Sequence, residues 1–231
     1  MNGPRILSVV IPAYNEERTI AAVLERVGAV MLPGWEKEII VVDDGSRDRT
    51  AAEIERFSDQ VRLLRHEENR GKGAAIRTGI AAATGDAVII QDADLEYHPE
   101  DWPSMLDAWQ KNTGAVIYGS RELHPERRGY PHYVAGVKVL TMINNALFGS
   151  RLTDIYTCYK LFPRALIQSV PLASNGFEIE AEVTARLLRQ GVAICEVPIR
   201  YTPRTFREGK KIRFRDGIIG IRTLVAHRFF I

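Results

Sequence analysis

Three carboxylates follow one short apolar run at every second position. Asp92, Asp94 and Glu96 come directly after the run at residues 87–90. In an extended backbone alternate side chains point the same way, so these three would share one face. Like charges gathered in this way need a cation, and Mg²⁺ is typically held by one or two carboxylates together with substrate phosphates. The pattern indicates a divalent metal site, and the alternative is an ordinary turn, where Asp is favoured for backbone reasons.

Two other polar motifs also follow apolar runs. "PAYNE" (residues 12–16) comes after the run at 6–11, and "DDGS" (43–46) comes after the run at 38–42. These runs and those at 61–64, 87–90 and 115–119 are rich in Val and Ile, which predicts strands buried on both faces of a parallel sheet. In such sheets ligands bind beyond the carboxyl ends of the strands. We therefore expect the three motifs to converge at one edge.

Helical patterns alternate with these strands, which predicts an α/β fold with right-handed crossovers. In the first half, helices are expected from residue 16 to about 31 with Asn15 as its cap, after residues 43–48, and over 71–83. In the second half, a helix is expected to end near residue 149, followed by a strand at 158–162, a helix at 178–191, a strand at 192–199 and a helix at 216–231. Between residues 200 and 215 seven Lys and Arg face one acid, which suits an anionic partner.

Composition excludes several classes of protein. The chain has 231 residues, 45% of them hydrophobic, and a net charge of +2, so one domain is the default and nothing global suggests nucleic acid. Cys158 and Cys195 are isolated, which fits a reducing, cytoplasmic setting. No apolar run is long enough to span a bilayer. We expect a cytoplasmic protein, either soluble or peripheral on the membrane face.

The motifs together resemble a known enzyme family. "VVIPAYNEE", "VVDDGSRDRT", "NRGKGAAIRTG", "QDADLE" and "GSR" stand in one order and resemble the family 2 glycosyltransferases of the GT-A fold. "TDIYTCYKLF", "FEIEAEVTARL" and "EVPIRYTPRTFREGKKI" resemble a narrower branch, the dolichol- or polyprenol-phosphate hexose synthases. The resemblance implies a GT-A domain over residues 1–204, then a basic loop and C-terminal helix over 205–231. It also implies inverting, Mg²⁺- or Mn²⁺-dependent transfer of a hexose from a nucleotide sugar to a polyprenyl phosphate.

The same resemblance assigns roles to individual residues. Asp92, Asp94 and Glu96 would bind the metal, although related enzymes often carry Gln at the position of Glu96. The donor would contact Pro12, Tyr14, Glu16, Val42, Asp44, Lys72, Asp92, Ala93, Arg204, Arg207 and Lys211. Arg121 would bind the acceptor phosphate with Lys138, where relatives commonly carry Arg. "NRGKG" could present backbone N–H groups and Lys72 to a phosphate, or it could be an ordinary loop.

The acceptor determines whether a base is required. A phosphate monoester is already largely a dianion at neutral pH, so it needs cationic side chains and not a general base. A sugar hydroxyl would need a base, and Glu178, Glu180 and Glu182 are candidates that cannot all share one helical face. Transfer to a glycan hydroxyl is therefore one alternative. A nucleotide-sugar-binding protein without turnover is another. GDP-mannose and UDP-glucose are the leading donors, followed by UDP-N-acetylhexosamine, and the sequence leaves the base and the sugar open.

A lipid acceptor would require contact with the membrane surface. The segment 216–231 offers an apolar stripe at helical spacing, formed by Ile218, Ile221, Leu224, Val225 and Phe229. Such a helix could lie in the interface of the bilayer. The alternatives are a helix packed on the domain, a homo-oligomer interface, or a partner subunit that anchors the protein.

Overall fold

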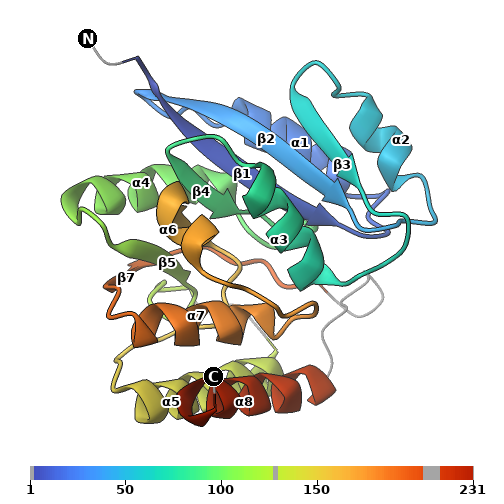
Figure 1. Cartoon of the computed structure of the whole chain (residues 1–231). Coiled ribbons are helices and arrows are strands. Elements are labelled where there is room, and N and C mark those ends of the chain that lie inside the picture. The colour runs from blue at the N-terminus through green and yellow to red at the C-terminus, as the bar shows by residue number, and fades with distance from the viewer. Residues whose placement is uncertain (1–2, 127–129, 205–213, 231) are drawn as a thin grey trace.

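A computed structural model describes residues 3–126, 130–204 and 214–230 of the chain. Within these ranges seven strands form one sheet in the order β3-β2-β1-β4-β6-β5-β7 (Figure 1). Their bounds are β1 (Arg5–Ala13), β2 (Trp35–Asp43), β3 (Val61–Arg65), β4 (Ala87–Ile90), β5 (Val116–Ser120), β6 (Lys160–Pro163) and β7 (Ile194–Pro198). Strand β6 runs antiparallel to both of its neighbours, and the other pairs are parallel. The predicted α/β fold with a mostly parallel sheet is confirmed.

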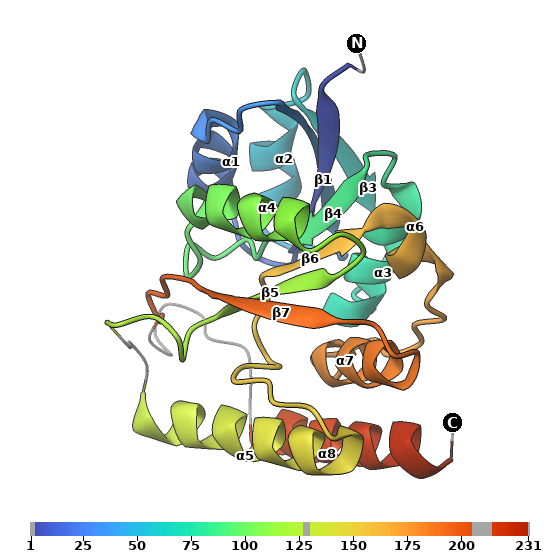
Figure 2. The same cartoon turned by 90° about the vertical axis from the view of Figure 1, so that its left-hand side faces the viewer.

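Helices cover both faces of this sheet. They are α1 (Ile20–Ala29), α2 (Thr50–Glu55), α3 (Lys72–Ala82), α4 (Trp102–Lys111), α5 (Pro131–Phe148), α6 (Arg164–Ser169), α7 (Ile179–Arg189) and α8 (Phe214–Phe229), with a short 3₁₀ turn, η1 (Pro99–Asp101). Figure 2 shows α1, α2 and α4 on one side of the strands and α3 and α6 on the other. Val9 of β1, Ile40 of β2 and Ile89 of β4 are fully enclosed between these layers, whereas β3 at the edge of the sheet is only partly buried.

Helix α1 begins later than expected. It starts at Ile20, so the prediction of a helix from residue 16 with Asn15 as cap is wrong. Asn15 instead adopts a left-handed backbone with φ of 50°. Its side-chain oxygen accepts from the amide of Arg47, and its own amide donates to the hydroxyl of Ser46. The segment between β1 and α1 is therefore a loop fastened to the loop after β2, which places Glu16 at the sheet edge.

A separate layer lies below the sheet. Helices α5 and α8 run side by side beneath α7 in both views (Figures 1 and 2). A second apolar cluster joins the three helices, with Leu140 from α5, Ala181 and Ala185 from α7, and Leu224 from α8. The predicted apolar stripe of α8 is therefore divided: Leu224 is buried, while Ile218 is 48% and Phe229 is 65% exposed. Packing on the domain therefore accounts for Leu224, and the role of the exposed part of the stripe stays a prediction.

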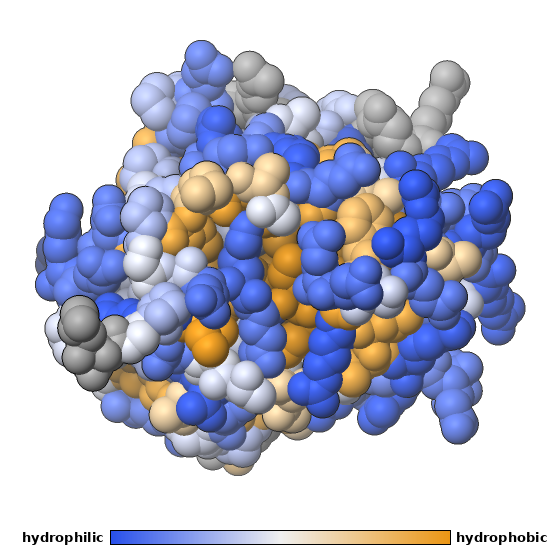
Figure 3. All heavy atoms as spheres, turned by 90° about the horizontal axis from the view of Figure 1, so that it is seen from above, coloured by the Kyte–Doolittle hydropathy of each residue, from blue (hydrophilic) through white to orange (hydrophobic). Residues whose placement is uncertain are grey.

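Apolar surface is not confined to that layer. Seen from above (Figure 3), the opposite face carries charged and polar side chains around a central region of apolar atoms.

Within the part of the chain that the structure describes, no helix combines the length and apolar character needed to cross a bilayer.

Candidate active site

The three motifs that follow β1, β2 and β4 meet at one pocket. These strands are parallel neighbours, so the residues beyond their carboxyl ends lie at the same edge of the sheet. The pocket has a volume of about 610 Å³ and is lined by Pro12, Tyr14, Glu16, Asp44, Lys72, Asp92, Ala93, Asp94, Glu96, Arg121 and Arg204 among others. The prediction that the motifs converge at one edge is confirmed.

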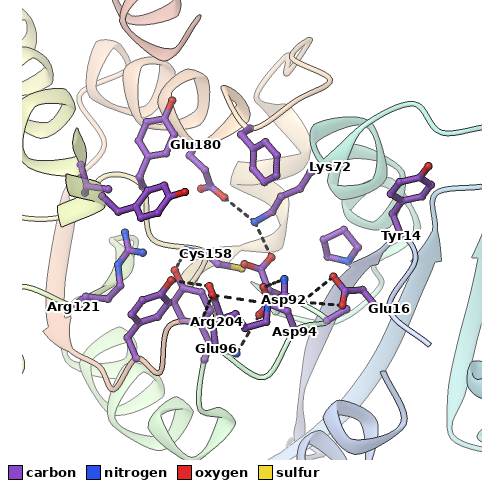
Figure 4. A pocket seen from close by; sticks show the side chains of 18 of the residues that line it. Tyr14, Glu16, Lys72, Asp92, Asp94, Glu96, Arg121, Cys158, Glu180 and Arg204 are labelled. Carbon is purple, nitrogen blue, oxygen red and sulfur yellow. Dashed lines mark hydrogen bonds and ion pairs between the residues drawn. The ribbon is translucent and has the colours of Figure 1, made fainter. Parts of the chain in front are cut away.

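One guanidinium lies among three of the carboxylates. Nη2 of Arg204 is 2.7 Å from Oδ2 of Asp94, and Nη1 is 3.0 Å from Oε2 of Glu16. Glu96 accepts from the backbone amide of Arg204 at 2.7 Å and from the hydroxyl of Tyr201 at 2.7 Å. These side chains point toward one another from separate segments in Figure 4. The carboxylates come from the β1 and β4 edges, and Arg204 follows β7.

A second cation lies on Asp92. Nζ of Lys72 is 2.7 Å from Oδ1 of Asp92 and 3.7 Å from Oε1 of Glu180. Glu180 in turn pairs with Lys160, whose ammonium is buried and also donates to the carbonyl of Thr157. Charges of alternating sign thus run from the core to the pocket, and Figure 4 shows Lys72 between Glu180 and Asp92.

The protonation of the aspartates reflects these neighbours. Burial raises the pKa of Asp94 to about 7, and the charges of Asp92 and Glu96 act in the same direction, while Arg204 opposes them. Burial also disfavours the charged form of Asp92, but the charge and hydrogen bond of Lys72, together with Cys158 and Arg204, outweigh it, and the pKa of Asp92 lies below its usual range. Carboxylates that destabilise one another in this way suit an added cation.

The donor set fits a hard divalent cation. Asp92, Asp94 and Glu96 offer only carboxylate oxygens, which Mg²⁺ and Mn²⁺ favour. In the described segments no three acidic, His or Cys side chains are gathered as a ready metal-binding group. Side-chain cations lie on Asp92 and Asp94 instead, so binding a metal requires rearrangement of Lys72 or Arg204.

Asp44 organises the loop before α3. Its two carboxylate oxygens accept from the ring of His66 at 2.6 Å, the amide side chain of Asn69 at 3.0 Å, and the backbone amides of Arg70 and Gly71 at 3.0 and 2.7 Å. This network explains why an acid stands at the carboxyl end of β2. The same hydrogen bonds hold the backbone directly before Lys72, whose side chain lines the pocket.

Backbone amides of the "NRGKG" loop donate hydrogen bonds to the protein itself. The amides of Gly73 and Ala74 both donate to the carbonyl of Asn175, at 2.7 and 3.2 Å, and those of residues 70 and 71 donate to Asp44. Of the two interpretations of this stretch, these contacts favour an ordinary loop over a backbone phosphate site. A Cβ on Gly73 would lie 2.5 Å from the carbonyl oxygen of Ser174, so this glycine is required for close packing. The side chain of Lys72, in contrast, lines the pocket.

Arg121 is held in place by one acid. Its Nε and Nη2 donate to the two oxygens of Asp154 at 2.7 and 2.8 Å, and its guanidinium lies 5.0 Å from the centre of the Tyr201 ring. This fork uses two of the five N–H donors of Arg. Lys138 is not among the pocket-lining residues; it is half exposed on α5 and lies 3.2 Å from Glu122.

Other predicted residues have different positions. Val42 is fully buried within β2 and does not line the pocket. Ala93 lines the pocket, and its carbonyl accepts from the hydroxyl of Thr19. Arg207 and Lys211 lie outside the described residues.

The three candidate bases on α7 have separate environments. Glu178 accepts from the amide of Gly176 at 2.9 Å. Glu182 accepts from the amide of Ser174 at 2.7 Å and pairs with Arg186 at 2.8 Å. Of these three acids only Glu180 lines the pocket.

An aromatic and apolar wall was missed by sequence reasoning. It is formed by Tyr130, Pro131, Tyr133, Val134 and Val137 at the start of α5 and by Tyr156. Phe177 also lines the pocket, and its ring centre lies 5.8 Å from Nζ of Lys72. The Tyr-Pro-x-Tyr run before a helix was the available signal, but its side chains reach the pocket only because α5 crosses beneath the sheet edge. The lining therefore combines two kinds of side chain, with Arg121 also in the wall. The part formed by Asp92, Asp94 and Glu96 is here called the acidic end, and the part formed by the start of α5 the apolar end.

The sequence is similar to those of curated enzymes that transfer sugars. The chain is 28% identical over 210 residues to a dolichol-phosphate mannosyltransferase of Pyrococcus furiosus, covering 88% of this chain and 58% of that relative. It is 29% identical over 176 residues to a dodecaprenyl-phosphate galacturonate synthase of Rhizobium johnstonii, covering 72% of this chain and 50% of that relative. The chain thus spans little more than half the length of these curated relatives.

A solved structure shows the same fold. The glucosyl-3-phosphoglycerate synthase of Mycobacterium tuberculosis, in complex with Mn²⁺, uridine diphosphate and phosphoglyceric acid, aligns with a TM-score of 0.73 at 22% identity, over 96% of this chain and 77% of that one. This likeness confirms the GT-A fold. The model of the family described as glycosyl transferase family 2 matches residues 8–170, more than half of the sequence. The chain belongs to glycosyl transferase family 2.

Proposed function

We propose that this protein transfers a hexose, with inversion, from a nucleotide sugar to a polyprenyl phosphate. The observation that carries the proposal is the two-ended pocket, in which a carboxylate cluster and an aromatic, apolar wall enclose one volume. The two curated relatives described above are named for sugar transfer involving dolichol or dodecaprenyl phosphate, which supports the same acceptor class. The division into a catalytic domain of residues 1–204 and a membrane-directed part of residues 205–231 belongs to this proposal.

The acidic end is assigned to the donor. Asp92, Asp94 and Glu96 would hold Mg²⁺ or Mn²⁺. When bound, such an ion would offset the charge that builds on the departing nucleoside diphosphate. Lys72 and Arg204 carry the positive charge already present at this end, and Arg is well suited to bidentate contacts with phosphate oxygens. Pro12, near the end of β1, and Tyr14, just after it, also line the pocket.

Arg121 is assigned to the acceptor phosphate. Asp154, which is 1% exposed at its side chain, fixes the guanidinium, so its remaining N–H donors have a defined direction. A phosphate dianion held there needs no base to become nucleophilic. Glu180 is the candidate base that reaches the pocket, but it is paired with Lys160, and its other oxygen is 3.7 Å from Lys72. This environment favours a phosphate acceptor over a sugar hydroxyl.

The apolar wall is assigned to the first part of the lipid. Tyr133, Val134 and Val137 lie on α5, the helix that forms the lower layer with α8. The two helices also expose large apolar side chains, namely Val139 and Met142 on α5 and Ile218, Ile219 and Phe229 on α8. We infer that this layer contacts the membrane surface, which brings the pocket near the headgroups. Flotation with anionic liposomes tests this, and a Met142→Ser, Phe229→Ser variant should float less than the parent protein.

An acceptor series tests the function itself. The protein is incubated with Mn²⁺ and either GDP-mannose or UDP-glucose, and then with polyprenyl phosphate, 3-phosphoglycerate or a short glycan. Transfer to polyprenyl phosphate alone is the expected result, because only that acceptor offers both a phosphate for Arg121 and an apolar chain for the wall at the start of α5. Transfer to 3-phosphoglycerate at a comparable rate would assign the apolar wall to another role. Transfer to the glycan would contradict the proposal.

A further inference from the structure

Arg204 makes contacts that a cation between carboxylates would make. Its guanidinium lies 2.7 Å from Asp94 and 3.0 Å from Glu16, and its Nε is 3.9 Å from Glu96. The side chains of all four residues are at most 13% exposed. Two of the three acids, Asp94 and Glu96, belong to the stretch with metal-ligand chemistry. The guanidinium therefore uses the oxygens that a divalent ion would need.

The position of Arg204 in the chain makes an exchange physically reasonable. It follows β7 and the isolated bridge between Tyr97 and Tyr201, so its backbone is attached to the rest of the fold just before it. Its backbone amide is held by Glu96, whereas its guanidinium is held by Asp94 and Glu16. The side chain can move to a new partner while the backbone contact remains.

A diphosphate is the partner that would attract it. Guanidinium groups bind phosphate oxygens through the same paired N–H donors that they offer to carboxylates. A metal placed among these carboxylates would repel Arg204, and a diphosphate on that metal would attract it. The metal alone would leave Arg204 without its carboxylate partners, and the diphosphate alone would leave the carboxylates without a cation.

We propose that Arg204 couples the binding of the divalent metal to the binding of the nucleoside diphosphate, by holding Asp94 and Glu16 until the diphosphate takes its guanidinium. The coupling rests on the proposed function for the diphosphate, while the competition between Arg204 and the metal does not. By linkage, each ligand must raise the affinity for the other by the same factor. The wild-type protein should therefore bind Mn²⁺ weakly alone and tightly with a nucleoside diphosphate.

The test measures free Mn²⁺ by electron paramagnetic resonance, alone and with saturating UDP or GDP, without any turnover. Arg204→Gln removes the competing charge, so it should bind Mn²⁺ alone about tenfold to a hundredfold more tightly than wild type, the usual effect of one charged hydrogen bond. The same variant should bind the diphosphate more weakly, and the diphosphate should change its Mn²⁺ affinity less. Arg200→Gln is the matched control, because Arg200 lies in the same segment and pairs with Asp101 away from the cluster. It should behave as wild type.

The results separate the competition between Arg204 and Mn²⁺ from the proposed nucleotide donor. Equal or weaker binding of Mn²⁺ by Arg204→Gln would overturn the inference. Tighter binding of Mn²⁺ by the variant, with no response of wild type to either UDP or GDP, would support the competition and contradict the proposed donor. If Arg204→Gln does not fold by circular dichroism, Arg204→Lys replaces it. That variant keeps the charge but loses the fork, so it should bind Mn²⁺ alone with an affinity above wild type, and an unchanged affinity would overturn the inference.

Discussion

The substitution Glu180→Met should destabilise the protein far more than the same substitution combined with Lys160→Met. Both side chains are buried, with 8% of Glu180 and 1% of Lys160 exposed, and they form a direct ion pair. Removing Glu180 alone leaves the Lys160 ammonium in the core with the carbonyl of Thr157 and the Tyr118 ring, 4.9 Å away, as its neighbours. Removing both charges leaves two apolar side chains of similar size.

The expected magnitudes differ clearly. Breaking a buried ion pair from one side costs about 3–5 kcal/mol, whereas replacing both partners by apolar residues is often neutral. For a chain of this size each kcal/mol shifts the melting temperature by about 2–4 °C, so the single substitution should lower it by about 6–20 °C. The paired variant should melt within a few degrees of wild type, since its remaining cost is about 1 kcal/mol for the hydrogen bond lost at Thr157.

The paired variant also tests the identity of the acceptor. If Glu180 were a general base for a sugar hydroxyl, its loss would lower turnover by about 10²–10⁴-fold in the paired variant as well. With a phosphate acceptor, turnover should stay within about tenfold, because what is lost is one polar contact to Lys72. Thermal unfolding and transfer rates of the three variants are the measurements. A single variant as stable as the paired one, or a paired variant that folds without turnover, would refute this reasoning.

Three further predictions follow from the site. Asp94→Ala should abolish transfer and donor-dependent Mn²⁺ binding while the melting temperature changes little, because Arg204 keeps Glu16 as a partner. Near-normal turnover would refute the metal assignment. Arg121→Ala should raise the apparent KM for the acceptor about tenfold to a hundredfold, with little change in the KM for the donor. Steady-state kinetics with each substrate varied in turn measures both values. A raised KM for the donor alone would mean that Arg121 binds the nucleotide. Gly73→Ala should destabilise the protein by about 1–3 kcal/mol, because its Cβ would lie 2.5–3.0 Å from backbone atoms of residues 174–176. Gly136→Ala on α5 has open space around its Cβ and should be neutral or stabilising in urea unfolding, so equal effects at the two glycines would contradict the packing argument.

The central strands of the sheet could be predicted from short stretches of sequence. The Val- and Ile-rich runs of β1, β2 and β4 are buried on both faces, so their composition alone identifies them. Once these strands are parallel neighbours, the convergence of the carboxylates after β1, β2 and β4 follows from the geometry of the sheet. The short α6 and the helix α4 were not predicted.

The rest of the site depends on contacts between distant segments. Arg204 meets Glu16 across 188 positions, and Arg121 meets Asp154 across 33, and no local pattern specifies either pair. The glycines of the "NRGKG" loop illustrate the same limit. They suggested a phosphate cradle, but Gly73 is required because the loop at residues 174–176 packs against it. Glycine can indicate close approach of any backbone, and the sequence does not say which one.

The C-terminal helix shows why an apolar stripe is ambiguous. Leu224 and Phe229 share the helical spacing that a membrane-surface helix would have, yet one is fully buried against α5 and α7 and the other is 65% exposed. Spacing reports that apolar side chains share a face. It does not report how much of that face another helix covers.

The most direct measurement of the central claim uses two lipids that differ only in their phosphate. The protein, Mn²⁺ and a nucleotide hexose are incubated with polyprenyl phosphate or with the matching polyprenol, and the lipids are analysed by mass spectrometry. The proposed function predicts a polyprenyl phosphate heavier by one hexose and an unmodified polyprenol, because Arg121 recognises the phosphate and no base activates a hydroxyl. A glycosylated polyprenol, or no lipid product with either GDP-mannose or UDP-glucose while a glycan is glycosylated, would contradict it.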